Sequence, residues 1–126
     1  MRSLMPQDAQ EEATFSWLSI TAGICEEILY RGFVLVVLTP LLGTVGAVAV
    51  SSIVFGLGHA YQGVGGFAKT SAVGFALAGL TLLSGSLWIP MVVHAALDLN
   101  AGYLARRCLV TPDAMAPGEA AGNVCC

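Results

Sequence analysis

Long apolar stretches separated by short polar or glycine-rich ones run through this chain. The pattern predicts four helical segments, which are 13–38, 41–60, 67–84 and 87–104. A helix needs about 20 mostly apolar residues to cross a bilayer, and these segments are close to that length or longer. Thr39-Pro40 is expected to end the first segment, because proline lacks an amide donor and disfavours helical geometry in the residue before it. The sequence therefore predicts an all-α fold, a polytopic membrane helix bundle of about four transmembrane helices.

The stretches between the predicted helices are expected to be turns and loops. Residues 61–66 are rich in glycine and are expected to form a loop, and the Ser-Gly-Ser sequence of 84–86 a tight turn. Residues 1–12 form a polar N-terminal lead, 13–107 the membrane core, and 108–126 a flexible C-terminal tail. We therefore expect a single domain with short polar ends.

The composition also indicates a membrane protein. Apolar residues make up 56% of the chain and charged residues only 10%, whereas ordinary soluble domains are about 25% charged. The formal net charge of −3 is too small to indicate a nucleic-acid or acidic partner. We therefore expect an integral membrane protein whose surroundings are the lipid bilayer, with no nucleic-acid partner.

The few basic residues predict an orientation. Arg2, Lys69 and Arg106-Arg107 all fall on one side of the membrane if the chain crosses it four times. Basic residues collect in the cytoplasmic segments of membrane proteins. Both termini and the 61–66 loop are therefore expected to be cytoplasmic, with the protein in the cell membrane.

Small residues recur four positions apart in the second and third segments. Gly43 and Ala47 form one such pair, and Gly74 and Ala78 form another. Such pairs let two helix backbones approach closely in a membrane, where lipid provides no hydrophobic drive for association. The second and third helices are therefore expected to pack against each other through these positions.

Only a few ionisable side chains lie within the apolar segments. They are Glu26, Glu27 and Arg31 in the first segment, His59 at the end of the second, and His94 and Asp98 in the fourth. Lipid cannot solvate such groups, so all of them are expected to point into the bundle. Glu27 and Arg31 share one helix face and are expected to form an ion pair that gives structural and electrostatic support, whereas Glu26 points aside toward another partner.

These side chains suit hydrolysis, although other functions remain open. A carboxylate and an imidazole that hold one water can deprotonate it for attack on a carbonyl carbon, and a second imidazole can stabilise the oxyanion. Glu26, His59 and His94 would be the ligands if a metal such as zinc were bound, so the cofactor stays open. Proton or metal-ion transporters also use intramembrane Glu and His, and a non-proteolytic membrane scaffold with a vestigial site is a third class.

Three short motifs follow one another on successive predicted helices. They are Glu26-Glu27-x-x-x-Arg31, Phe55-x-x-x-His59 and His94-x-x-x-Asp98. In this order they resemble the signature motifs of the CPBP intramembrane proteases, the family of type II CAAX-prenyl endopeptidases and bacteriocin-processing (Abi) proteins. The resemblance covers about 13–107 and implies an all-helical intramembrane endopeptidase. Its substrate would be a peptide or protein at the membrane, with prenylated CAAX proteins as one class.

The resemblance also implies roles for single residues. Glu26 and His59 match the family positions that activate water, and His94 and Asp98 match those that line the oxyanion side. The family has Asn or Asp at the last position, and an ionised carboxylate would repel an oxyanion, so Asp98 is expected to orient His94 instead. Phe55 is expected to position the face of the second helix by packing. The family has been described both as metal-dependent and as glutamate-based, so the resemblance does not settle the cofactor.

The expected depths of Glu26 and His59 in the membrane do not match. Glu26 precedes Thr39, the expected outer end of the first helix, by thirteen positions, whereas His59 follows Leu41 by eighteen. The difference of five positions corresponds to about 7–8 Å along a helix axis. If both side chains hold one water, helix tilt or a different end of the first helix must remove this difference.

Overall fold

The computed structural model describes residues 9–110, and every secondary-structure element within this range is helical. The elements are α1 (Ala9–Glu27), the π-helix η2 (Ile28–Val34), α2 (Leu35–Gly58), the 3₁₀ helix η3 (Ala60–Gln62), α3 (Gly63–Ser84) and α4 (Trp88–Val110). The all-α fold is thereby confirmed. Residues 1–8 of the polar lead and 111–126 of the tail lie outside the described residues, so the domain limits stay a prediction.

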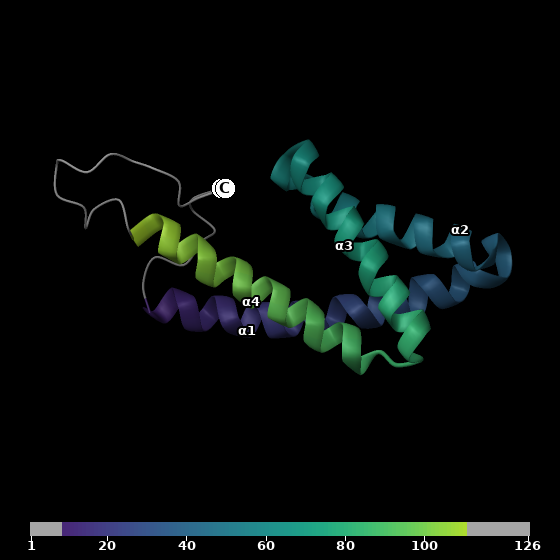
Figure 1. Cartoon of the computed structure of the whole chain (residues 1–126), viewed down its shortest axis with the longest axis horizontal. Helices are drawn as coiled ribbons and strands as arrows, with labels where there is room; N and C mark the ends of the chain where they lie inside the picture. The colour runs from purple at the N-terminus through teal and green to yellow at the C-terminus, as the bar shows by residue number, and fades with distance from the viewer. Residues whose placement is uncertain (1–8, 111–126) are drawn as a thin grey trace.

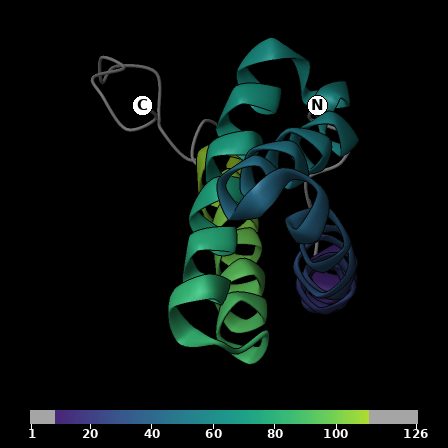
Figure 2. The ribbon, with the colours of Figure 1, turned by 90° about the vertical axis from the view of Figure 1, so that its right-hand side faces the viewer.

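The helices are arranged as two pairs. α1 lies beside α4, and α2 lies beside α3, with the most extensive contacts of the molecule within these pairs (Figure 1). The start of α1 and the end of α4 lie at the same end of the molecule. Figure 2, turned by 90°, shows α1 nearly end-on with α3 and α4 to one side of it. The two pairs are joined where η2 contacts α2 and where α3 contacts α4.

The first long helix ends at Gly43, not at Thr39-Pro40. Gly43 has φ +70° and ψ 167°, a backbone conformation that glycine adopts readily because it has no Cβ. Residues 35–42 of α2 therefore complete the first helix, and residues 44–58 form the second. Pro40 is tolerated in the last turn before the bend, where the missing amide donor costs a single hydrogen bond. The predicted helix end was wrong by about one turn.

The other predicted boundaries agree in part. The expected 61–66 loop is helical instead, since η3 runs to Gln62 and α3 begins directly at Gly63. The tight turn is confirmed, because α3 ends at Ser84 and Gly85 has φ +63°. α1 begins before residue 13 and α4 continues beyond residue 104, where alanine, glutamate and arginine favour helix.

Small residues form the contact between α2 and α3. Ala47 and Ala78 are both buried there, and a Cβ added at Gly74 would lie only 3.0 Å from Cδ1 of Phe55. Close packing of these two helices is therefore confirmed for three of the four predicted positions. Gly43 has no such role, because a Cβ added there would have no neighbour within 4 Å.

Many large apolar side chains face away from the rest of the chain. Val45, Val64 and Leu83 are each more than 80% exposed. Apolar side chains on the outside suit lipid surroundings, in which they need no protein cover. Two helical stretches, Gln10–Gly58 and Ala60–Ser84, are long and apolar enough to cross a membrane. The number of spans stays a prediction.

Candidate active site

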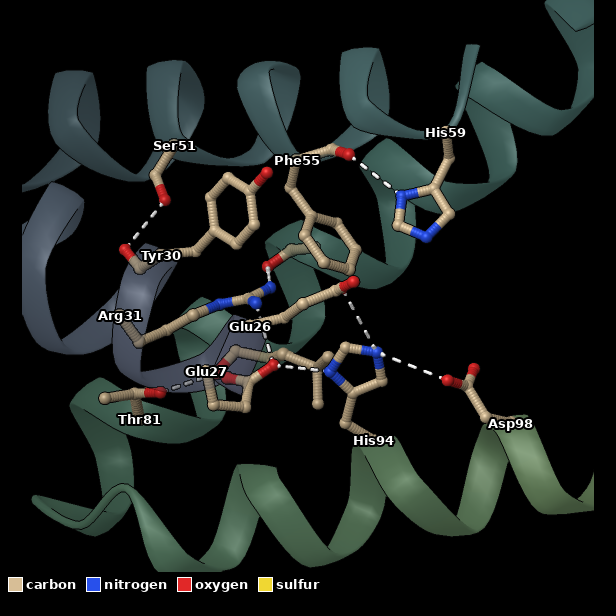
Figure 3. A network of polar contacts seen from close by, with 12 residues as sticks. Glu26, Glu27, Tyr30, Arg31, Ser51, Phe55, His59, Thr81, His94 and Asp98 are labelled. Carbon is tan, nitrogen blue, oxygen red and sulfur yellow. Dashed lines mark hydrogen bonds and ion pairs between the residues drawn. The ribbon is translucent and has the colours of Figure 1, made fainter. Parts of the chain in front are cut away.

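The bend at Gly43 brings Glu26 and His59 to nearly the same depth. Glu26 precedes Gly43 by seventeen positions, and His59 follows it by sixteen. The expected mismatch of five positions is thus reduced to one, or about 1.5 Å along the axis. Glu26 is on α1, His59 follows the end of α2, and Figure 3 shows both side chains directed toward the same region between α2 and α4.

Glu27 is the centre of a buried polar network (Figure 3). Its Oε1 accepts hydrogen bonds from Arg31 Nη1 at 2.7 Å and from His94 Nδ1 at 2.8 Å. Arg31 Nη2 also donates to the carbonyl oxygen of Gly74 in α3 at 2.9 Å. Glu27, Arg31 and His94 are 0%, 2% and 4% exposed. The ion pair predicted from the spacing of Glu27 and Arg31 is therefore present, and it connects α1, η2, α3 and α4.

Two further carboxylates face the other ring nitrogen of His94. Nε2 lies 3.8 Å from Glu26 Oε2 and 3.8 Å from Asp98 Oδ2, which is longer than a hydrogen bond. The Glu26 side chain is 29% exposed and that of Asp98 is 41% exposed. Glu26 Oε2 is itself buried and has no hydrogen-bond partner among residues 9–110. Oε2 therefore has no competing hydrogen bond within this range, and the partly exposed side chain keeps the carboxylate at the edge of the buried network.

His59 lies beyond the last turn of α2. Its Nδ1 is 3.2 Å from the carbonyl oxygen of Phe55, which can only accept, so Nδ1 carries a proton. In the neutral ring Nε2 is then an acceptor. Within the described part of the chain His59 forms no ion pair with Glu26. That these two side chains share one water therefore stays a prediction.

Phe55 lies between the two histidines and is 1% exposed. The centroid of its ring is 5.2 Å from that of His59 and 5.6 Å from that of His94. Tyr30 packs edge-on against it at 5.0 Å, and the guanidinium carbon of Arg31 lies 4.7 Å from the ring centroid. Edge-on aromatic and cation–π contacts of this kind are favourable. Phe55 therefore contacts both the buried ion pair and the two imidazoles.

The π-helix η2 holds a residue for which the sequence suggested no role. The amide of Leu35 donates to the carbonyl of Tyr30 across five residues, and Ser51 Oγ donates to the same carbonyl at 3.1 Å. These bonds connect η2 to α2, and π-helical turns are frequent at functional sites. In the sequence, only the position of Tyr30 next to Arg31 indicated that it lies near the site. The sequence could not indicate that the Gly74 carbonyl binds Arg31, because every residue has a backbone carbonyl.

The contacts of His94 bear on two expectations. Asp98 was expected to orient its ring, but Glu27 holds Nδ1 and Asp98 faces Nε2 beyond hydrogen-bonding distance. Asp98 is one turn along α4, whereas Glu27 reaches the ring from the neighbouring helix. His94 was also expected to line the oxyanion side, and this role stays a prediction, with Nε2 3.8 Å from Glu26 Oε2.

Zinc binding would require Glu26, His59 and His94 to lie around one point. Among the residues that the structure describes, no group of three or more His, Cys, Asp or Glu side chains could hold a metal ion. Glu26, His59 and His94, the ligands considered for zinc, therefore do not form such a group.

A family model matches residues 10–100, which include all three motifs, and its description is Type II CAAX prenyl endopeptidase Rce1-like. The chain belongs to this family. Membership in the Rce1-like family confirms the resemblance to the CPBP proteases and makes the chain a membrane-embedded endopeptidase by class, with a peptide substrate at the membrane. No curated protein and no solved structure matches the chain.

Proposed function

We propose that this chain hydrolyses a peptide bond within the membrane and that Glu26 activates the attacking water. The observation that supports this most is Glu26 Oε2, a buried carboxylate oxygen 3.8 Å from an imidazole nitrogen and without a hydrogen-bond partner among residues 9–110. A general base must reach the proton that it abstracts, so an occupied oxygen would be a poor candidate. Glu27 also has an oxygen without a partner in that range, Oε2, but its Oε1 is bound by both Arg31 and His94 and the residue is 0% exposed, so a reactant cannot reach it.

The reaction follows from these positions. Glu26 takes a proton from the water as the water oxygen bonds to the carbonyl carbon, which gives a tetrahedral oxyanion. When the carbon–nitrogen bond breaks, the proton passes from Glu26 to the leaving nitrogen, so Glu26 ends the cycle as a carboxylate. Transfer of this kind typically contributes about 10²–10⁴ in rate.

The two histidines and Asp98 assist this reaction. His59 offers Nε2 as an acceptor for the second proton of the water, since its Nδ1 faces the Phe55 carbonyl. A protonated His94 presents an N–H at Nε2 toward the oxyanion, where a fixed donor stabilises developing charge. Asp98 faces the same nitrogen at 3.8 Å, where its carboxylate attracts that N–H.

The family supports a CAAX-type substrate with a prenyl group. The direct test is cleavage by purified protein in liposomes, using a prenylated CAAX peptide and the same peptide without the prenyl group. We expect cleavage of the prenylated peptide by the native chain and none by Glu26→Gln, which keeps the shape but removes the base. Equal cleavage by both proteins would contradict the role of Glu26. Loss of native activity in chelator, restored by zinc, would replace this mechanism with a metal-bound water.

We also propose that the site opens to the cytoplasm, because Lys69 and Arg106-Arg107 would lie on that side. A single cysteine placed beside Lys69, in a variant whose native cysteines are replaced, tests this orientation in intact cells. An impermeant thiol reagent should label it only after the cells are opened. Labelling of intact cells would place this end of α3 outside.

A further inference from the structure

His94 has two ring nitrogens with different surroundings. Nδ1 faces Glu27 Oε1 at 2.8 Å, in a place where both side chains are almost fully buried. Nε2 faces Glu26 and Asp98, each at 3.8 Å, on the partly exposed side. A neutral imidazole carries one proton, and the nitrogen that holds it decides what the other can do. A partner that keeps the first proton on Nδ1 leaves Nε2 to take the second, and the protonated ring then offers an N–H at Nε2.

We infer that Glu27 is a positioning residue, which keeps a proton on Nδ1 of His94 and turns Nε2 toward Glu26 and Asp98. This inference rests on the proposed function for its consequence in catalysis, but the hydrogen bond itself does not. Glu27 Oε1 is a carboxylate oxygen already bound by Arg31, so toward Nδ1 it can only accept. The hydrogen of that bond must come from the ring.

The geometry goes beyond what a structural ion pair needs. Arg31 already has two acceptors, Glu27 Oε1 and the carbonyl oxygen of Gly74. Glu27 uses the same Oε1 for His94, while its Oε2 is buried without a hydrogen-bond partner in the described range. The carboxylate is thus oriented so that one oxygen serves both Arg31 and His94. Phe55, packed edge-on at 5.6 Å, restricts rotation of the imidazole.

A flipped ring would be inactive in this scheme. A half-turn of the imidazole would place a carbon against Glu27 and Nδ1 away from it, so the buried carboxylate would lose a donor. Nε2 would then no longer face Glu26. Glu27 therefore selects both the tautomer and the orientation of His94, as carboxylates do for histidines in other catalytic sites.

The test is nitrogen-15 NMR of histidine-labelled protein, which distinguishes protonated from unprotonated ring nitrogens without any substrate. The chain has two histidines, so His59→Gln leaves His94 as the sole signal. At the highest pH at which this variant stays folded, we expect a protonated Nδ1 and an unprotonated Nε2. Adding Glu27→Gln should give a mixture of tautomers. An unprotonated Nδ1 with Glu27 present would overturn the inference, as would the same single tautomer after Glu27→Leu, which leaves no side-chain acceptor for Nδ1.

Glu27→Gln alone strands the Arg31 charge, so a second variant guards against misfolding. The double variant Glu27→Gln with Arg31→Gln removes both charges and leaves two amides that can bond to each other. If it folds, its kcat should fall at least about tenfold while KM changes little, because the ring is misplaced but the substrate still binds. An unchanged kcat together with a single unchanged tautomer would assign Glu27 a structural role only.

These outcomes separate the inference from the proposed function. If the native chain cleaves no peptide, the NMR result still decides whether Glu27 sets the tautomer. If instead the tautomer is independent of Glu27 but Glu26→Gln abolishes cleavage, the inference fails and the proposed function stands.

Discussion

The two sides of the His94 ring differ in how closely the neighbouring polar groups approach and how deeply they are buried. On the Glu27 side every contact is 2.9 Å or shorter, and Glu27 and Arg31 are buried. On the Glu26 side the contacts are 3.8 Å long and the carboxylates are partly exposed. Catalytic groups must be held in place and yet be free to bind a reactant. Glu27 and Arg31, here called the tight side, meet the first condition. Glu26 and Asp98, here called the loose side, meet the second.

The difference also separates stability from activity. A buried charge without its partner is strongly destabilising, so residues of the tight side should mainly affect folding. A partly exposed carboxylate that forms no hydrogen bond can lose its charge at little cost to the fold. Neighbours in sequence, such as Glu26 and Glu27, are therefore expected to respond in different ways to the same substitution.

Loss of Arg31 should have the largest effect on stability. Arg31→Met would leave Glu27 buried with only one donor and should destabilise the fold by about 3–5 kcal/mol. Denaturant unfolding in detergent measures this change. Lys69→Met is the matched control, because Lys69 is exposed on α3 and its replacement should change stability by less than about 0.5 kcal/mol. Equal effects of the two substitutions would mean that the buried ion pair does not hold the tight side together.

A smaller effect on stability is expected at Gly74, where α3 contacts α2 next to Phe55. Gly74→Leu would force a side chain against Phe55 and should cost about 1–3 kcal/mol from overpacking. Gly79 lies on the same helix, and a Cβ added there has no neighbour within 4 Å. Gly79→Leu should therefore leave the unfolding transition in place or raise it. A Gly74→Leu protein as stable as the Gly79→Leu protein would show that this contact is looser than the structure indicates.

The smallest effect is expected on the loose side, at Asp98. Asp98→Asn keeps the shape and removes a charge 3.8 Å from His94 Nε2. A partly exposed pair of this length contributes about 0–1 kcal/mol, so the cleavage rate should fall by no more than about fivefold. Steady-state kinetics with the prenylated peptide measures it. A loss of more than about a hundredfold, which one carboxylate can supply as a general base, would make Asp98 a principal catalytic group.

Spacing within one helix predicted part of this site correctly. The interval of four residues correctly predicted an ion pair between Glu27 and Arg31. Both side chains are buried because lipid cannot solvate a charge. The second interval of four, His94 to Asp98, also brought the two side chains near each other. The spacing did not reveal that Glu27, on a different helix, would bind the His94 ring. Sequence spacing carries no information on how α1 packs against α4.

The end of the first helix shows a different limit. Pro40 was the strongest local signal against helix, but it lies in the last turn, where its missing donor matters little. Gly46 follows Gly43 closely in the sequence, and nothing local marks Gly43 as the residue with positive φ. The shift from Pro40 to Gly43 nevertheless decides whether Glu26 and His59 lie at one depth. A shift of about one turn in one helix end thus accounts for most of the depth difference expected between Glu26 and His59.

The most direct test of the contrast between the two sides compares Glu26→Gln with Glu27→Gln. Each purified variant is measured twice, once for cleavage of the prenylated peptide and once for its unfolding midpoint in detergent. We expect Glu26→Gln to lose at least about a hundredfold in rate with an unchanged midpoint, because a base is lost and its Oε2 has no hydrogen-bond partner within 9–110 to lose. Glu27→Gln should lower the midpoint as well as the rate. A Glu26→Gln protein that cleaves like the native chain, or that unfolds as early as Glu27→Gln, would contradict the account.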